Sequence, residues 1–276
     1  MIERGYASSL SRIRGVDVVH WNPKYRLAVR GRTLANLPWR ANNFGDLLGP
    51  LIVDKLLDRQ LTADMSSRPT RVTTVGSILH FAQQGDTVWG TGVNGKVDST
   101  RHRFTSLDVR AVRGPRTAHF LEQRGLPVDV PYGDPALLLP DLFPDLRHIS
   151  ETKLYKQTVV PNLNDLPLFR GHPDLLDPRS PVMTCLRRIV QSEFVVGSSL
   201  HAMIVSEAFG IDFVLLDSRS ESPFKFHDYA EGTNRRLTPR AADLASAPSA
   251  PRMEPLDYAS TPLLNSFPYD LWGPAE

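Results

Sequence analysis

The residues best suited to chemistry lie around His201, within residues 194–211. Ser198 and Ser199 follow a short apolar run, and apolar residues at helical spacing begin at Leu200. A strand, a small-residue turn and a helix start leave backbone N–H groups unpaired beside the positive end of the helix dipole. The pattern predicts an anion site beside an imidazole, and a bound anion favours the protonated imidazole. The alternative is a histidine that only packs at a capped helix start.

A second candidate is the turn Asn43-Phe44-Gly45-Asp46. Its amide and carboxylate could hydrogen-bond sugar hydroxyls, and Asp46 could accept a proton from one of them. The spacing leaves open a structural alternative, in which Asp46 caps the following helix and Gly45 permits the turn.

Positive charge is expected from Arg113 and Arg116, which stand with Thr117 at a strand-to-helix turn. Arginines suit bidentate contacts with carboxylate or phosphate, although a solvated basic face fits the same pattern. Lys225 could add charge or extend to the surface. The glycines of residues 90–92 could let a ligand approach the backbone, but they do not complete a dinucleotide-binding motif.

These residues need a scaffold that brings strand ends together. Strands alternate with helices along the chain, which predicts an α/β fold with parallel sheets and chemistry at the carboxyl ends of the strands. The expected strands are residues 16–21, 72–75, 87–89, 107–112, 157–160, 194–196 and 211–216; the expected helices are residues 47–57, 181–191, one from Pro115 to Gly125 and one from Leu200 to Gly210.

Composition predicts the structure of three further stretches. Residues 22–42 are rich in Pro and Arg and are expected to form a loop over the sheet edge. Prolines punctuate the chain from residue 140 to about residue 150, which predicts a boundary between an N-terminal domain, 1–150, and a smaller C-terminal domain, 151–276. Residues 240–276 are expected to form a tail packed on the body.

Composition narrows the class of protein. The 276 residues carry a formal charge of +2, which argues against nucleic acid as a partner. One cysteine, Cys185, excludes an intramolecular disulfide and suits a reducing cytosol. Neither a signal peptide nor a membrane-spanning run is evident, and no metal-ligand spacing occurs. We expect a cytoplasmic protein that could work at the inner face of the membrane.

Four motifs occur in an order that resembles the polysaccharide pyruvyl transferase family: NFGD at 43–46, VRGPRT at 112–117, GDPALLL at 133–139 and SSLHAMIVSEAFG at 198–210. The resemblance implies transfer of pyruvate from phosphoenolpyruvate to a sugar, commonly as a ketal bridging two hydroxyls. It implies a GT-B-like fold, in which two Rossmann-like domains face a cleft. His201 and Arg113 would bind and activate phosphoenolpyruvate, and Asn43 and Asp46 would lie on the acceptor side.

The chain departs from the family pattern in three places. It is short for the family, it has Pro161-Asn162 where relatives often have Pro-His, and Gly114 follows Arg113 where an acidic residue is common. Two other functions therefore stay open: a glycosyltransferase of the GT-B type that uses a nucleotide sugar, and a non-catalytic binding module.

The expected function is transfer of pyruvate to a sugar of a surface polysaccharide or its lipid-linked precursor, with phosphoenolpyruvate as co-substrate and no metal or other cofactor. The residues expected in catalysis are His201 and Asp46, and those expected to bind substrate are Asn43, Gly45, Arg113, Arg116, Thr117, Ser198, Ser199, Leu200 and Lys225.

Overall fold

The computed structural model describes residues 2–4, 7–29, 32–58 and 70–273, and its largest sheet has five strands in the order β2-β3-β6-β7-β8. Only β2 is antiparallel to its neighbour, so the sheet is mixed with a parallel majority. Its inner strands are almost fully buried, which is usual for parallel strands covered on both faces. The strands are β2 (Ser9–Ile13), β3 (Val16–His20), β6 (Thr70–Thr73), β7 (Thr87–Trp89) and β8 (Asp108–Ala111).

A second sheet contains β9 (Thr158–Val159), β10 (Phe194–Gly197) and β11 (Asp212–Leu215). All three strands are parallel, with β10 in the middle. Seven of these strands lie where the apolar runs predicted them, within one or two residues at each end; β2 was not predicted, because residues 1–15 are polar and have no apolar run. The α/β class is therefore confirmed, and the two sheets are compatible with Rossmann-like folding.

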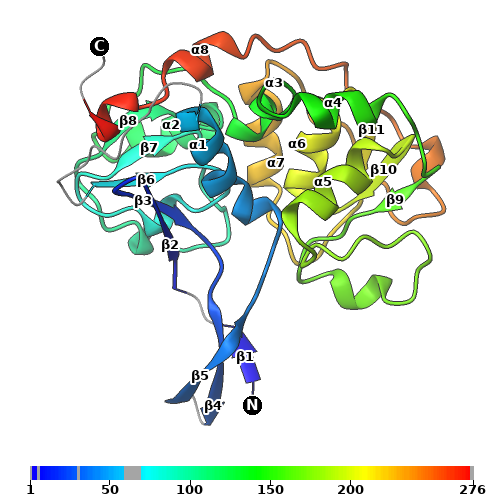
Figure 1. Cartoon of the computed structure of the whole chain (residues 1–276), viewed down its shortest axis with the longest axis horizontal. Helices are drawn as coiled ribbons and strands as arrows, with labels where there is room; N and C mark the ends of the chain where they lie inside the picture. Colours follow the sequence, from blue (N-terminus) through cyan, green and yellow to red (C-terminus); the bar gives the residue numbers. More distant parts are fainter. Residues whose placement is uncertain (1, 5–6, 30–31, 59–69, 274–276) are drawn as a thin grey trace.

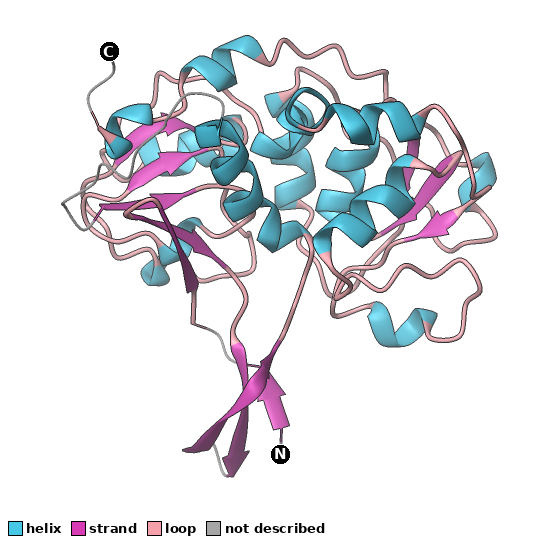
Figure 2. Cartoon of the chain, viewed as in Figure 1, coloured by secondary structure: helices cyan, strands magenta, loops and turns pink. Residues whose placement is uncertain are grey.

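Helices fill the space between the two sheets (Figure 2). The helix α1 (Leu48–Asp58) packs on β3, and α6 (Leu200–Ala208) packs on β10 and β11. The short helix η4 (Pro135–Leu138) contacts both α1 and α6. The other long helices are α2 (Pro115–Glu122), α5 (Val182–Val190) and α7 (Phe224–Gly232).

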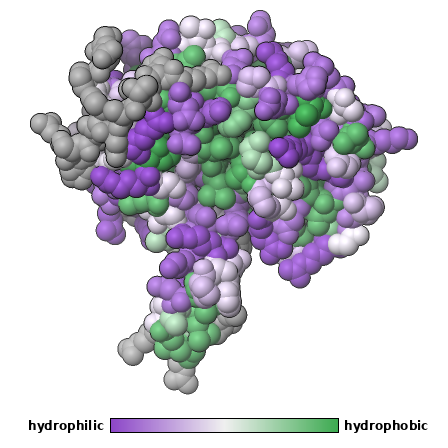
Figure 3. Space-filling view, viewed as in Figure 1, coloured by the Kyte–Doolittle hydropathy of each residue, from purple (hydrophilic) through white to green (hydrophobic). Residues whose placement is uncertain are grey.

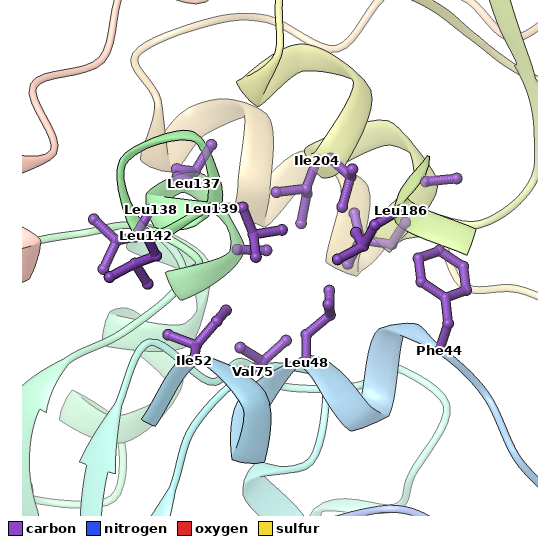
Figure 4. Close-up of a cluster of buried hydrophobic side chains, with 14 of the residues drawn as sticks. Phe44, Leu48, Ile52, Val75, Leu137, Leu138, Leu139, Leu142, Leu186 and Ile204 are labelled. Atoms are coloured by element: carbon purple, nitrogen blue, oxygen red, sulfur yellow. The ribbon is translucent and has the colours of Figure 1, made fainter. Parts of the chain in front are cut away.

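One apolar core joins the two halves of the molecule, the first built around the five-stranded sheet and the second around β9, β10 and β11 (Figure 4). Phe44, Leu48 and Ile52 approach it from the first half, and Leu186 and Ile204 approach it from the second. All are buried, and removing a side chain of this kind from a core costs about 2–5 kcal/mol of stability. The core therefore fixes the two sheets relative to each other and so sets the position of anything between them.

The proline-punctuated connector before residue 150 is helical. It forms α3 (Leu139–Leu142) and α4 (Pro144–Ser150). Pro140 and Pro144 occupy the first turns of these helices, where a missing N–H group costs no hydrogen bond. The prolines therefore mark helix starts; the predicted division at residue 150 falls between the two sheets and stays a prediction.

Residues 22–42 are not a loop over the sheet edge, and that prediction is wrong. They form β4 (Lys24–Val29) and β5 (Arg32–Arg40); β4 pairs with β5 on one side and with β1 (Ile2–Arg4) on the other, in an antiparallel sheet. The three strands project from the body as an arm (Figure 1). Frequent arginines and a proline obscured the strand pattern, although Tyr25, Leu27 and Val29 alternate with other residues as a strand requires.

The tail predicted from residue 240 packs on both sheets: Ala241 and Ala247 lie in the core of β9, β10 and β11, and the segment from residue 261 to 273 packs on the first half of the molecule. Trp272 Nε1 donates to Ile13 O at 2.9 Å, and Trp89 Nε1 donates to Leu263 O at 3.1 Å. The segment contains α8 (Thr261–Asn265) and η7 (Tyr269–Trp272). Within the described ranges, no helix combines the length and apolar character needed to cross a bilayer.

Candidate functional site

A cavity of about 1000 Å³ lies between the two halves of the molecule. Its lining comes from segments that follow the carboxyl ends of the parallel strands, as the α/β pattern predicted. The first half contributes Trp21, Asn43, Asp46, Ser77, Ile78, His80, Phe81, Asn94, Lys96, Val97, Asp98 and Arg101; the second contributes Asn162, Leu163, Asn164, Ser199, Leu200, His201, Glu221 and Lys225.

The start of α6 forms one wall of this cavity. Ser199 is the N-cap, and its hydroxyl accepts a hydrogen bond from Ala202 N at 3.3 Å. The first helical N–H groups, those of Leu200 and His201, have no acceptor within the helix. Gly197 precedes the turn because a side chain there would lie 2.0 Å from Val160 O. The local sequence thus brings a helix N-terminus to the cavity.

Ser198 does not line the cavity, in contrast to its predicted role. Its hydroxyl donates to Asp165 Oδ2 at 2.7 Å and accepts from Asn162 Nδ2 at 2.9 Å. Ser218 and Ser220 extend the same network. The hydroxyl of Ser198 is therefore buried in this network at the end of β10 and stabilises the turn there. Asn162 belongs to the same network and also lines the cavity.

His201 is 7% exposed, and burial together with the charges of Lys225 and Arg113 lowers its pKa to about 3. The imidazole is therefore neutral without a ligand, and its protonation beside a bound anion stays a prediction. Its Nε2 lies 4.0 Å from Asp134 Oδ2. Neither atom has a hydrogen-bond partner among the described residues. Burial also raises the pKa of Asp134 to about 6.

The turn at residues 43–46 packs directly against His201, and Asn43 and Asp46 line the cavity beside it. Asn43 Nδ2 donates to Asp46 Oδ2 at 2.6 Å. Burial raises the pKa of Asp46 to about 6, against the opposing effect of this hydrogen bond. No side chain caps the helical turn η1 (Gly45–Leu47), so the structural alternative, in which Asp46 serves as a helix cap, is not supported. Gly45 is required because a Cβ there would lie 2.1 Å from His201 Nδ1.

Two lysines meet one carboxylate at the cavity, one lysine from each half. Lys96 Nζ donates to Glu221 Oε1 at 2.7 Å, and Lys225 Nζ donates to Glu221 Oε2 at 2.5 Å. The Lys225 side chain is 11% exposed, and burial lowers its pKa. Burial opposes ionisation of Glu221 as well, but Lys225 and Lys96 outweigh it and lower the pKa of Glu221. An incoming anion could take the place of this carboxylate between the lysines.

Arg113 does not reach the cavity, although the sequence predicted a ligand contact. Its side chain is fully buried and donates to Asp228 Oδ2 at 3.0 Å, Ser77 Oγ at 2.6 Å and Val93 O at 2.9 Å. A buried guanidinium needs such partners because an unpaired charge is costly there. The arginine therefore holds the loops behind the cavity in place.

Arg116 and Thr117 do not line the cavity either, because their side chains bind carboxylates of α7. Arg116 forms a bidentate pair with Glu231 at 2.6 and 2.8 Å, and Thr117 Oγ1 donates to Asp228 Oδ2 at 2.7 Å. These contacts fasten α2 to α7. The neighbouring glycine Gly92 serves the same packing, since a Cβ there would lie 2.4 Å from the Arg113 guanidinium. The idea that this glycine admits a ligand is therefore not supported.

Sequence reasoning missed Lys96, Glu221, Asn94 and Asn162. Two signals could have found the charged residues. Glu221 and Lys225 have opposite charges and are four residues apart, with Glu221 just before α7 and Lys225 in its first turn. Lys96 directly follows the glycine-rich end of a strand, which is where a ligand-binding group is expected. Among the described residues, no three His, Cys, Asp or Glu side chains gather in a way that could hold a metal ion.

The model of the polysaccharide pyruvyl transferase family matches residues 76–220, which is just over half of the chain. The succinoglycan biosynthesis protein ExoV of Rhizobium meliloti (strain 1021) is 30% identical to this chain over 151 residues, which cover 52% of this chain and 46% of that protein. The match thus spans about half the length of the curated relative. No solved structure matches the chain.

Proposed function

This chain belongs to the polysaccharide pyruvyl transferase family, and we propose that it transfers pyruvate from phosphoenolpyruvate to a sugar, as a ketal. One observation carries the proposal: a single cavity joins a helix N-terminus, a neutral histidine and two lysines to a turn that holds a carboxylate. The relative is named as a succinoglycan biosynthesis protein, which supports a sugar of a surface polysaccharide as the acceptor.

Phosphoenolpyruvate brings a phosphate and a carboxylate, which need hydrogen-bond donors and positive charge. The free N–H groups at Leu200 and His201 suit one of these anionic groups. Lys96 and Lys225 suit the other once Glu221 has moved aside. Arg113 supports the site from behind through Ser77, which lines the cavity. No resident cofactor or metal is needed for this scheme.

Ketal formation requires a proton on the methylene carbon of phosphoenolpyruvate, so that C2 gains oxocarbenium character and a sugar hydroxyl can attack it. A second hydroxyl then attacks C2 and phosphate leaves. A bound dianion would raise the pKa of His201 from its low value, so that the imidazole could carry the proton that goes to carbon or to the leaving phosphate. Asp46 would accept the proton of the attacking hydroxyl.

We place the acceptor on the side of residues 1–150 and phosphoenolpyruvate on the side of residues 151–276, in a GT-B-like arrangement. Asn43 and Asp46 lie on the first side, and Leu200 and His201 on the second, which supports this division. A precursor carried on a lipid would bring the protein to the inner face of the membrane in the cytoplasm.

Release of inorganic phosphate from phosphoenolpyruvate in the presence of candidate acceptor sugars tests the proposal. We expect release only with an acceptor that offers two suitably placed hydroxyls. The variant His201→Ala should lose about 10²- to 10⁴-fold in turnover and keep its circular dichroism spectrum. His119→Ala is the matched control, because that histidine is exposed on α2.

Two results would point elsewhere. If calorimetry shows binding of a nucleoside diphosphate and none of phosphoenolpyruvate, the chain is a glycosyltransferase. If phosphoenolpyruvate binds tightly and no acceptor in a broad panel releases phosphate, the chain is a binding module. Near-normal turnover of His201→Ala would remove the histidine from the mechanism.

A further inference from the structure

The arm formed by β1, β4 and β5 exposes large apolar side chains. Leu34 is 63% exposed, Trp39 54%, Val29 49% and Leu27 37%. The main contacts of the arm strands are with one another. The apolar surface gathers at the far end of the arm, and hydrophilic surface covers the part next to the body (Figure 3). A small sheet of this kind needs something to cover its apolar side chains.

Charge identifies what can cover them. Residues 22–42 contain five Lys or Arg and no Asp or Glu, so this segment carries +5 while the whole chain carries +2. The rest of the chain is therefore net negative, at −3. Apolar and aromatic side chains interspersed with basic ones are typical of protein surfaces that enter the interface of an anionic bilayer. The same charge opposes pairing of the arm with the arm of a second copy.

The arm is also joined directly to the cavity. The segment leaves the body after Trp21 and returns at Asn43, and both of these residues line the cavity. Its base is tied together by Ala41 N, which donates to Pro23 O at 2.9 Å, and by Arg40 Nη1, which donates to Asn22 O at 2.7 Å. The base of the arm is therefore fixed beside the cavity, and its two long strands connect the cavity to whatever the far end binds.

We propose that the arm docks on the surface of an anionic lipid bilayer, with Leu34 and Trp39 in the interface and basic side chains against the headgroups. This inference rests on the proposed function in one respect: docking there would present the cavity to an acceptor carried on a lipid. The docking itself depends only on the arm, so it can be measured without turnover.

Flotation of the full chain with vesicles tests the proposal. We expect binding to vesicles of phosphatidylcholine with phosphatidylglycerol, little binding to phosphatidylcholine alone, and weaker binding as salt rises. The double variant Leu34→Ser/Trp39→Ser should bind at least tenfold more weakly. The matched control is Leu154→Ser/Leu168→Ser, which replaces exposed leucines away from the arm and should bind as the wild type does.

Equal binding by the arm variant and the wild type would overturn the proposal, as would no binding of the wild type to anionic vesicles. Sedimentation velocity is run on the same proteins: a wild-type dimer that the arm variant converts to monomer, with vesicle binding unchanged, would assign the surface to a second copy. Phosphate release with a water-soluble acceptor separates the two proposals, because the arm variant should retain it. Absence of release in the wild type would count against the transferase and leave the vesicle result unaffected.

Discussion

Two clusters of charge join the first half of the molecule to α7 and to the turn before it, and they differ in whether a ligand can reach their charged groups. In the first, Arg113 pairs with Asp228, and both side chains are fully buried. In the second, Lys96 and Lys225 share Glu221, and all three line the cavity. Both clusters join a loop of the first half to the region of α7, yet only the second has charge that a ligand can reach.

The difference shows that a motif arginine is not by itself a ligand-binding group. The guanidinium of Arg113 has protein acceptors on all three of its nitrogens, so little donor capacity remains for a substrate. An ammonium group has three N–H donors, and each lysine has one carboxylate oxygen of Glu221 as its principal acceptor. We therefore expect loss of stability at the first cluster and loss of substrate affinity at the second.

The largest expected effect is on stability, from Arg113→Met. The variant leaves Asp228 buried without its counter-charge, which should lower the free energy of unfolding by about 3–5 kcal/mol. Urea unfolding followed by circular dichroism measures it. The control Arg116→Met removes a half-exposed pair with Glu231 and should cost less than about 1 kcal/mol. If Arg113→Met is as stable as the wild type but binds phosphoenolpyruvate more weakly, Arg113 is a ligand-binding residue and its role in stability is contradicted.

The second effect concerns the lysine cluster. Lys225→Met should weaken binding of phosphoenolpyruvate about tenfold to a hundredfold, because a hydrogen bond to a charged group is worth about 1.5–3 kcal/mol. Calorimetric titration measures the affinity directly. Lys156→Met is the matched control, since Lys156 is exposed and lies outside the cavity. Unchanged affinity in Lys225→Met would show that the cluster is structural, like that of Arg113.

The smallest effect is a shift in pH dependence at Asp46. The pKa of this carboxyl is about 6, so the base form is present above pH 6 and is lost as the pH falls below it. We expect kcat/KM to decline below about pH 6. Asn43→Ala removes a hydrogen bond that lowers the pKa of Asp46, so the decline should move to higher pH. An unmoved decline would assign it to a group other than Asp46.

Much of the fold followed from local patterns in the chain. Apolar runs located the parallel strands, and the helix expected at residues 47–57 is α1 (Leu48–Asp58). Composition was a poorer guide where Pro and Arg are frequent. The prolines before residue 150 begin two helices, and the arginines of residues 22–42 lie in strands, because both residue types have favourable places in regular structure.

The sequence by itself determined the residues around His201, because a helix start, an N-cap and a small-residue turn are set within a few neighbouring residues. Tertiary structure alone decided that Arg113 is buried and Lys96 is accessible. Their partners, Asp228 and Glu221, lie more than a hundred residues further along the chain, and only the packing of α7 against the first half brings them near. Burial and pairing depend on such distant contacts, so the chemistry of these charges could not be assigned before the fold was known.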